Sequence, residues 1–441
     1  MGMGKVHVDI FSLGCSKNLV DSERLARRFS DAGIDVSFDE EIPPRGSIVV
    51  VNTCGFIGDA KEESVFELLR FLDLKKRRLV KAVYAMGCLT ERYRNDIKGQ
   101  MPELDGIFGK FDWEKVVDTV LSDRDNTTGS PWARKLSTLP HFAYLKISEG
   151  CDRFCAFCAI PLITGRHHSR PVEEILSEVA ELAAKGTKEF NIIAQDLSSY
   201  GKDLKYTHGE PLADLIERMA DIEGVEMIRL HYAYPSDFPY SILPVMAKRK
   251  EVCKYLDIAL QHIDDIVLSN MRRHITSAQT RELLDRIRRE VPDIHIRTTM
   301  MVGFPGEDDA AFGRLIDFVK EQRFERLGAF AYCEEDDTFA AKNLDDNIPE
   351  ETKQARLEQL MAVQEEIAAE IAAAEIGKTL RVIIDEYDSD IQRWIGRSEY
   401  DSPEVDCNVF VASQTELEIG HIYDVLITDS DGFDLYGNAG L

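Results

Sequence analysis

The chain has 441 residues, a length that allows two to four domains and a sizeable hydrophobic core. Its formal net charge of −26 disfavours a protein that binds nucleic acid through broad phosphate contacts, and its composition is that of an ordinary globular protein. No apolar run is long enough for a membrane span. Residues 1–13 lack the basic start and apolar stretch of a signal peptide, so we expect a cytoplasmic protein.

The first third of the sequence alternates strand-like and helical patterns. Such alternation is typical of βαβ units and a parallel sheet, so we expect an N-terminal parallel α/β domain over residues 3–125. The expected strands lie at 6–11, 48–51 and 82–85, and the helical patterns that follow them lie at 19–32, 60–76 and 90–98.

The alternation starts again near Phe142. Six strand–helix units within one region predict a partial β/α barrel of the TIM type over residues 137–370, with its active site at the carboxyl ends of the strands. The strands are expected at 142–147, 189–193, 227–231, 255–260, 295–300 and 326–332, and the helices at 171–184, 213–219, 277–289 and 309–321.

A long helix is expected from 349 to about 374, trailing the barrel. Pro349 suits the first helical position. One apolar face of this helix predicts that it packs on the barrel. The residues of that face are Leu357, Leu360, Met361, Ile367 and Ile371. Beyond it, short strands with turn residues between them predict a small antiparallel β-barrel over 372–441. These strands are expected at 380–384, 392–395, 407–411, 422–427 and 433–436.

Three of the nine cysteines lie just past the first barrel strand. Cys151, Cys155 and Cys158 have the spacing C-x3-C-x2-C. Thiolates are the soft ligands of iron–sulfur clusters, and three of them can hold three irons of a cube while leaving the fourth open. The alternative is a zinc site or buried inert thiols. His167 and His168 follow at a spacing that fits no standard zinc finger.

A second set of cysteines follows the first three strands. Cys15, Cys54 and Cys88 each stand beside a glycine and are separated by about one βαβ unit. In a parallel sheet all three emerge at the carboxyl edge, where open α/β sheets bind ligands. They therefore predict a second three-thiolate site, the alternative being three unrelated buried cysteines. The remaining cysteines are interpreted as packing residues or at most a solvent-facing thiol; they are Cys253, Cys333 and Cys407.

The stretch from Glu149 to Cys158 closely resembles the radical S-adenosylmethionine superfamily, whose motif has the same spacing and an aromatic residue before the last cysteine. Phe157 occupies that position. The resemblance implies a 4Fe-4S cluster on Cys151, Cys155 and Cys158. Its open iron is chelated by S-adenosylmethionine, which an electron cleaves to methionine and a 5′-deoxyadenosyl radical. It also implies that Phe157 lies against the adenine.

The order of the three domains resembles the methylthiotransferase family over nearly the whole chain. Within it, the stretch 12–23 (SLGCSKNLVDSE) looks like the branch known as RimO, which modifies an aspartate β-carbon of small-subunit ribosomal protein twelve. The stretches 194–196 and 302–307 match family landmarks, so the resemblance implies that Gln195 and Gly303 contact the cofactor. Alanine at 259, where proline is usual, and the two histidines at 167–168 depart from the family pattern.

The resemblance implies a mechanism with two clusters and two molecules of S-adenosylmethionine. The radical formed at the central cluster removes hydrogen from an unactivated carbon, and a methylated sulfur species held at Cys15, Cys54 and Cys88 couples to that carbon. A reducing electron donor and a sulfur donor are implied partners. Rival hypotheses are a transfer RNA adenosine methylthiotransferase and a non-catalytic iron–sulfur electron carrier.

The C-terminal segment is strongly acidic. From Lys378 onward four basic and fourteen acidic residues give a net charge of −10. In the family this domain resembles the TRAM fold, often an RNA-binding module. So acidic a module repels phosphates and attracts a basic ribosomal protein, although a merely solvated acidic surface is the alternative. We therefore expect the basic ribosomal protein as partner and do not expect nucleic acid or membrane.

Overall fold

The computed structural model describes residues 6–121, 133–206 and 209–440. The expected domain limits at residues 3, 125 and 441 lie outside these ranges. The chain divides into two compact units. The first comprises residues 1–138 with the short pieces 149–152 and 158–167, and the second comprises the rest. Among the described residues, no helix is both long and apolar enough to cross a membrane.

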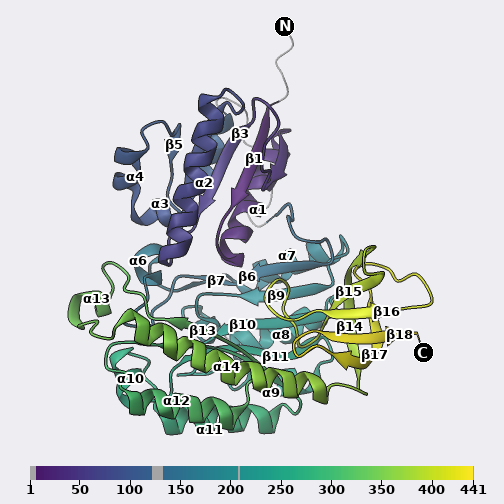
Figure 1. Cartoon of the computed structure of the whole chain (residues 1–441). Helices are drawn as coiled ribbons and strands as arrows, with labels where there is room; N and C mark the ends of the chain where they lie inside the picture. Colours follow the sequence, from purple (N-terminus) through teal and green to yellow (C-terminus); the bar gives the residue numbers. More distant parts are fainter. Residues whose placement is uncertain (1–5, 122–132, 207–208, 441) are drawn as a thin grey trace. The chain divides into compact units, whose positions relative to one another are not determined.

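The first unit is built on a five-stranded parallel sheet with the order β2-β1-β3-β4-β5 (Figure 1). The strands are β1 (His7–Ser12), β2 (Asp35–Phe38), β3 (Ile48–Thr53), β4 (Ala82–Gly87) and β5 (Gly106–Ile107). The helices are α1 (Ser16–Asp31), α2 (Gly58–Lys76), α3 (Cys88–Arg92), α4 (Arg94–Gln100) and α5 (Trp113–Leu121). The expected parallel α/β fold is confirmed. The helix expected at 90–98 is instead two short helices, divided at Tyr93.

Helices cover both faces of this sheet. Phe29 of α1 and Val116 of α5 pack on one face, whereas Phe71 of α2 and Ile97 of α4 pack on the other. Every residue of β3 is buried, as a central strand between two helical layers requires. Because helices cover both faces, the loops that follow the strands come together at the carboxyl edge of the sheet.

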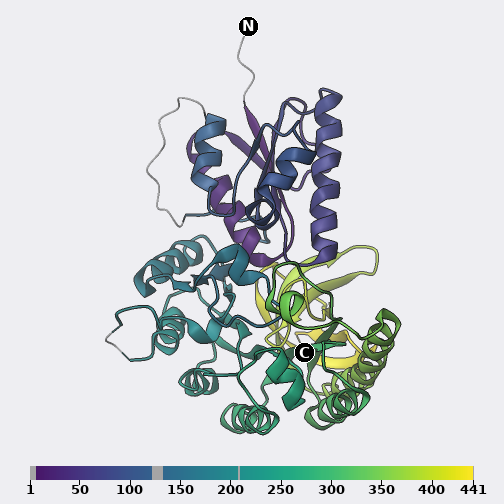
Figure 2. The same cartoon turned by 90° about the vertical axis from the view of Figure 1, so that its left-hand side faces the viewer.

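The second unit contains a six-stranded parallel sheet with the order β13-β12-β11-β10-β9-β6. Helices lie along its outer side (Figure 2). The sheet does not close on itself, which confirms a partial barrel. Its strands are β6 (Phe142–Lys146), β9 (Glu189–Ile193), β10 (Met227–Ala233), β11 (Val252–Gln261), β12 (His295–Val302) and β13 (Arg326–Ala331).

The connections of the barrel are mostly helical. They comprise β7 (Ser148–Glu149), α6 (Ile160–Thr164), β8 (His168–Ser169), α7 (Val172–Ala183), η1 (Leu197–Ser199), α8 (Pro211–Ala220), α9 (Ile242–Lys248), α10 (Asp265–Asn270), α11 (Ser277–Glu290), α12 (Asp309–Gln322) and α13 (Phe339–Asn343). The short helices α6, α9, α10 and α13 have only one or two turns, too few for a hydrophobic period to show in the sequence.

The long helix α14 (Glu350–Ala374) packs on β13 and α12. Pro349 is its N-cap rather than its first helical residue. Leu360 and Ile367 are buried as expected, but Met361 is 37% exposed. Two polar side chains share the buried face instead: Arg356 pairs with Glu307, and Gln364 donates to a backbone carbonyl. Because these polar groups are hydrogen-bonded, they can be buried. The apolar pattern in the sequence does not detect such residues, and its assignment of Met361 to the buried face is wrong.

The C-terminal strands form a closed barrel with the order β14-β15-β16-β18-β17. They are β14 (Thr379–Asp388), β15 (Arg393–Ser398), β16 (Val409–Ala412), β17 (Ile422–Ser430) and β18 (Leu435–Ala439). The barrel is antiparallel as expected except at one pairing, because β18 runs parallel to β16. The chain passes through β17 between these two strands, so β18 returns in the direction of β16.

Candidate active site

Three cysteines of the first unit follow three neighbouring strands. Cys15 is the N-cap of α1 after β1, Cys54 directly follows β3, and Cys88 opens α3 after β4. Because β1, β3 and β4 are adjacent and parallel, their carboxyl ends lie at one edge of the sheet. The structure thus brings Cys15, Cys54 and Cys88 to the same edge, as the spacing predicts.

The turns that carry these cysteines touch one another. Gly14 has a φ of +89°, and a Cβ built on it would lie 2.7 Å from both the Cβ and the Sγ of Cys54. A Cβ on Gly55 would lie 2.9 Å from the carbonyl carbon of Cys88. No larger side chain fits at either position without displacing a cysteine turn. The small residues let the turns close around a common space, as a bulky cluster requires.

Asn18 of α1 ties the same turns together and is almost completely buried. Its side-chain nitrogen donates to the carbonyl oxygens of Leu13 and Thr53, at 3.1 Å each. Its side-chain oxygen accepts from the Cys88 thiol and from the Lys110 ammonium, at 3.4 Å each. One amide therefore contacts groups at the carboxyl ends of β1, β3 and β4, together with Lys110 after β5.

The protonation of the three thiols differs. Burial raises the pKa of Cys54, and burial raises that of Cys88 to about 12. At Cys15 desolvation opposes ionisation, but the ammonium groups of Lys17 and Lys110 and backbone N–H donors outweigh it and lower the pKa. Iron binding needs thiolates, so an iron cluster at this site would displace protons from Cys54 and Cys88.

The chemistry of these thiols fits an iron–sulfur cluster better than a hard cation, because thiolates are soft ligands. Among the described residues, no group of three or more His, Cys, Asp or Glu side chains is arranged to hold a metal ion. The ligand role of the cysteines therefore remains a prediction.

The central cysteines lie on one loop that follows β7. Gly150, just before Cys151, has a φ of +78°, and a Cβ there would lie 2.0 Å from the carbonyl oxygen of Arg166. Only glycine fits in this position. The backbone N–H of Cys151 donates to Gly165 at 3.2 Å, which closes the loop onto the residues after α6. Local backbone geometry thus fixes the start of the motif.

Polar residues of the barrel surround Cys155. Arg273 donates a hydrogen bond to its Sγ at 3.3 Å, and the Tyr234 hydroxyl lies 3.5 Å from the same sulfur. Arg273 also donates to the carbonyl of Ala259. Every residue type has a backbone carbonyl, so Arg273 can make this hydrogen bond whether position 259 holds alanine or the usual proline. N–H donors to a ligand sulfur tune the reduction potential of a cluster.

Arg153, inside the cysteine motif, is fixed by the same region. Its guanidinium pairs with Asp196 after β9 at 2.6 Å and lies 4.3 Å from the centre of the Tyr234 ring. The Arg273 guanidinium lies 4.0 Å from the same ring. The loop around Cys155 is therefore anchored to residues that follow β9, β10 and β11, the carboxyl ends expected to carry the chemistry.

The three residues expected to contact the cofactor also follow or face these strand ends. Phe157 is half-buried and meets Phe304 edge-on, with ring centres 6.2 Å apart. Gln195 comes two residues after β9. Gly303 follows β12, and its N–H donates to the buried Glu307 at 2.9 Å. Their positions fit the expected role, which stays a prediction.

Sequence reasoning did not identify four polar side chains near the cysteines: Asn18, Lys110, Tyr234 and Arg273. Asn18 stands within the stretch that carried the family resemblance, but no role was assigned to it. Lys110 follows β5, whose two residues give no readable strand pattern. The signal that could have identified Lys110 and Tyr234 is their position shortly after a strand, provided that even the shortest strands are considered.

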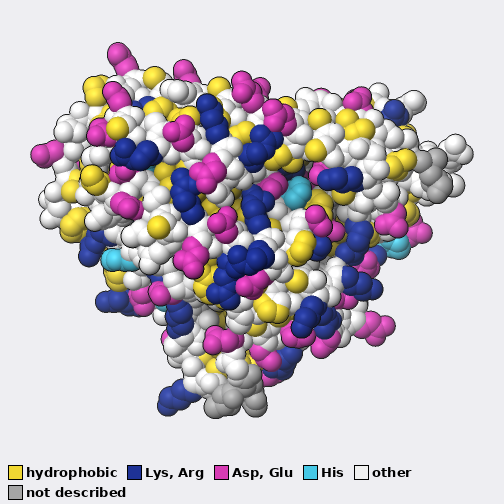
Figure 3. Space-filling view, turned by 90° about the horizontal axis from the view of Figure 1, so that it is seen from below, with side chains coloured by type: hydrophobic (Ala, Val, Ile, Leu, Met, Phe, Trp, Pro, Cys, Tyr) yellow, Lys and Arg dark blue, Asp and Glu magenta, His cyan; other side chains and the backbone are white. Residues whose placement is uncertain are grey.

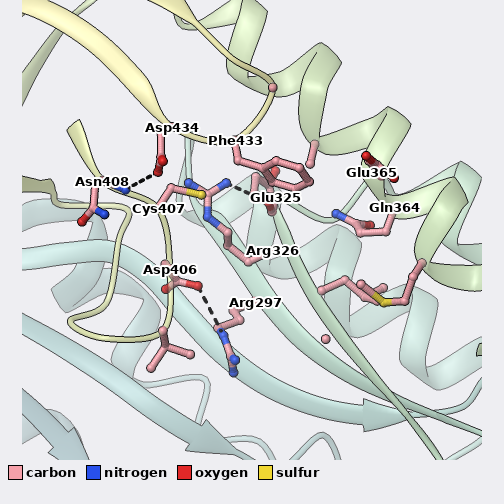
Figure 4. A pocket seen from close by; sticks show the side chains of 16 residues that line it. Arg297, Glu325, Arg326, Gln364, Glu365, Asp406, Cys407, Asn408, Phe433 and Asp434 are labelled. Atoms are coloured by element: carbon pink, nitrogen blue, oxygen red, sulfur yellow. Dashed lines mark hydrogen bonds and ion pairs between the residues drawn. The ribbon is translucent and has the colours of Figure 1, made fainter. Parts of the chain in front are cut away.

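A cavity of about 730 Å³ lies elsewhere in the second unit (Figure 4). It is bounded by the beginnings of β12 and β13, by α14 and by loops of the C-terminal barrel. Cys407 lines it, and burial raises the pKa of this thiol to about 12. Cys253 is buried with a pKa raised to about 11, whereas Cys333 is exposed. These positions match the packing and solvent-facing roles expected for the three cysteines.

Some carboxylates of the acidic tail are used inside the second unit. Asp385 accepts from His141 at 2.7 Å and pairs with Arg397, Asp401 pairs with Arg326 at 2.6 Å, and Asp406 accepts from the Tyr255 hydroxyl at 2.8 Å. These acids fasten the C-terminal barrel to the beginnings of the large barrel's strands. On the face shown in Figure 3, acidic and basic side chains are interspersed.

Comparisons with known proteins agree with this architecture. Three family models match: Uncharacterized protein family UPF0004 over residues 7–109, Radical SAM superfamily over 145–319 and TRAM domain over 376–439. Proteins named ribosomal protein uS12 methylthiotransferase RimO are similar over nearly the whole length. The protein of Phocaeicola vulgatus is 52% identical over 434 residues, which cover 98% of both chains. The protein of Cytophaga hutchinsonii is 43% identical over 438 residues, which cover 99% of this chain and 98% of the relative.

Among solved structures, the radical S-adenosylmethionine methyltransferase TsrM from Kitasatospora setae, with cobalamin and a [4Fe-4S] cluster bound, has a TM-score of 0.55 and covers 75% of each chain. Its sequence is 16% identical, so the likeness is one of fold.

Proposed function

Because the chain belongs to the RimO branch of the radical S-adenosylmethionine methylthiotransferases, we propose that it adds a methylthio group to the β-carbon of an aspartate of ribosomal protein uS12. The observation that carries the proposal is identity of 50% or more to proteins of that name over essentially the full chain. The convergence of Cys15, Cys54 and Cys88 at one sheet edge supports it from the structure.

We assign one 4Fe-4S cluster to each set of three cysteines. Bound at the open iron of the central set, S-adenosylmethionine would supply the radical that activates the substrate carbon. The chain's own residues bind and orient these groups: Arg273 and Tyr234 hold Cys155, and Gly150 shapes the loop. Phe157, Gln195 and Gly303 are proposed to line the adenosine and methionine parts of the cofactor.

We propose that the basic ribosomal protein docks on the exposed part of the acidic C-terminal barrel. Five acidic residues of this domain contact the large barrel: Asp385, Glu399, Asp401, Glu404 and Asp406. The hairpin between β14 and β15 instead carries exposed Glu386 and Asp390 beside the exposed ring of Tyr387. Carboxylates next to an aromatic ring suit lysine and arginine side chains.

Modification of purified uS12 by the reconstituted enzyme is the direct test. The reaction would contain S-adenosylmethionine, sulfide and a low-potential reductant, and mass spectrometry would locate the added methylthio group on one aspartate. Transfer RNA is supplied in a parallel reaction. Modification of RNA adenosine with uS12 unchanged would favour the transfer RNA hypothesis, and S-adenosylmethionine left intact with both substrates would favour an electron carrier.

A further inference from the structure

A buried ammonium group lies beside the three N-terminal cysteines. Lys110 is only 4% exposed. Its Nζ donates to Oδ2 of Asp21 at 2.9 Å and to Oδ1 of Asn18 at 3.4 Å, and a carboxylate oxygen of Glu149 lies 3.9 Å away. A lysine is seldom buried unless a carboxylate compensates it. Asp21 therefore explains how the charge is kept inside the domain.

The position of this charge is tied to the cysteines through Asn18. The amide oxygen that accepts from Lys110 also accepts from the Cys88 thiol, at 3.4 Å in both cases. Because its nitrogen is held by the carbonyls of Leu13 and Thr53, the amide cannot rotate freely. An ammonium has three N–H donors, and these two hydrogen bonds of Lys110 occupy two of them. The Lys110 ammonium thus lies at the sheet edge that carries the cysteines, with one N–H donor not used in these two hydrogen bonds.

The charges around the site show what such a cation is suited to do. Three thiolates at Cys15, Cys54 and Cys88 would stand near the carboxylates of Asp21 and Glu149. An anionic sulfur ligand on the remaining iron would add a further negative charge. A fixed ammonium in a buried, low-dielectric site offsets that charge more strongly than an exposed lysine does.

We propose that Lys110, held by Asp21 and Asn18, is the positioning residue that stabilises a small anionic sulfur ligand, of the hydrosulfide or alkylthiolate class, on the iron that the N-terminal cysteines leave open. The inference rests on the proposed function, which places a cluster there. The ligand brings its own electron pair and negative charge, so binding forms one iron–sulfur bond and needs no oxidant or reductant.

The test uses the full chain with Cys151, Cys155 and Cys158 replaced by alanine, so that the N-terminal cluster is observed alone. Two variants are made in this background: Asp21→Asn, and Asp21→Asn combined with Lys110→Met, which removes both charges of the Lys110–Asp21 ion pair. Sodium methanethiolate is titrated anaerobically and followed by visible absorption and by electron paramagnetic resonance of the reduced cluster.

Asp21→Asn should bind methanethiolate at least as tightly as the background, because Glu149, 3.9 Å from Lys110 Nζ, still compensates the ammonium. The double variant should bind roughly tenfold more weakly, the loss of one charge-assisted hydrogen bond. Its midpoint potential should also become more negative, because a nearby positive charge favours the reduced cluster. A purely structural ion pair would leave the affinity for methanethiolate unchanged. Lys115→Met, a matched change at an exposed lysine of α5, should leave both the affinity and the midpoint potential unchanged.

Equal affinity for methanethiolate in the two Asp21 variants would overturn the inference. If the double variant held no iron, Lys110→Gln would replace it, because the glutamine amide can still hydrogen-bond Asp21 and Asn18. The same tenfold loss is expected there, and unchanged affinity would overturn the inference again. A background protein without iron would refute the cluster assignment of the proposed function, and this inference with it.

Discussion

The imidazole ring of His295 stacks on the phenol ring of Tyr400, with 3.8 Å between ring centroids and 13° between ring planes. His295 is the first residue of β12 and Tyr400 follows β15, so the stack joins the large barrel to the C-terminal barrel. Burial lowers the pKa of His295 from 6.5 to about 4, more than the nearby Glu325 and Asp401 raise it.

This depressed pKa predicts a pH-dependent stability. The unfolded chain takes up a proton at His295 near pH 6.5, whereas the folded chain resists it until about pH 4. The free energy of unfolding therefore carries no penalty from His295 above pH 6.5. As the pH falls from 6.5 to about 4, it decreases by up to about 3 kcal/mol. Melting temperatures of the cluster-free chain between pH 7.5 and 4.5 should fall less steeply in His295→Phe, which keeps the stack. Parallel curves for both proteins would contradict this.

The iron content should follow the two sets of cysteines. Anaerobically reconstituted protein should hold about eight irons, because each set of three thiolates can bind one cubane. Replacing Cys151, Cys155 and Cys158 together with alanine should leave about half, measured by iron and acid-labile sulfide analysis. Cys253→Ala, a buried cysteine outside both sets, serves as the control and should change nothing. A triple variant with its full iron complement would disprove the central assignment.

The two clusters should differ in role. Replacing Cys15, Cys54 and Cys88 with alanine should abolish methylthio transfer but spare reductive cleavage of S-adenosylmethionine, because the radical arises at the other cluster. Formation of 5′-deoxyadenosine, quantified chromatographically, should remain within about threefold of the parent, since no central ligand is changed. A correctly folded variant that cleaves no S-adenosylmethionine would show that the division of labour is wrong.

Arg273 should influence the central cluster through its hydrogen bond to the Cys155 sulfur. Replacing it with methionine removes both the donor and the positive charge, so the midpoint potential of this cluster should become more negative. Cleavage of S-adenosylmethionine should slow by about tenfold, the effect of one charge-assisted hydrogen bond. Arg272→Met is the control at the neighbouring position, because the Arg272 guanidinium lies over the ring of Phe339 instead. An unchanged potential in Arg273→Met would refute this role.

Docking of uS12 should depend on the exposed acids of the C-terminal barrel. A variant with Glu386→Gln, Asp390→Asn and Glu416→Gln, three exposed carboxylates of this domain, should bind uS12 several-fold more weakly at low salt and with a flatter salt dependence. Each exposed charge contributes under about 1 kcal/mol. Binding is measured by titration at two salt concentrations. Asp385 is deliberately retained, because its pairing with His141 and Arg397 holds the domains together.

Each alternative to uS12 docking has its own signature in the same variant. Unchanged affinity for uS12 would identify a merely solvated acidic surface. Tighter binding of transfer RNA, with uS12 affinity unaltered, would favour an RNA substrate, because removing negative charge reduces phosphate repulsion.

Spacing along the sequence was enough to predict the two cysteine sets, the three domains' fold classes and the edge where Cys15, Cys54 and Cys88 meet. Hydrophobic periods report strands and long helices, and parallel strands bring their carboxyl ends together whatever the loops contain. Short elements such as β5 and α6 escaped, because two to five residues are too few for a hydrophobic period to show.

What only the tertiary structure decided is the set of polar partners around the sites. Lys110 reaches Asn18 across 92 residues of chain, and Arg273 reaches Cys155 across 118. Whether Asp385 faces solvent or pairs with His141, 244 residues away, likewise depends on how the two barrels pack. Local propensity carries no information about such pairings, because strand order, register and domain packing set which side chains meet. The sequence by itself determined which thiols are the candidate cluster ligands, and the fold alone determined which charged side chains lie near them.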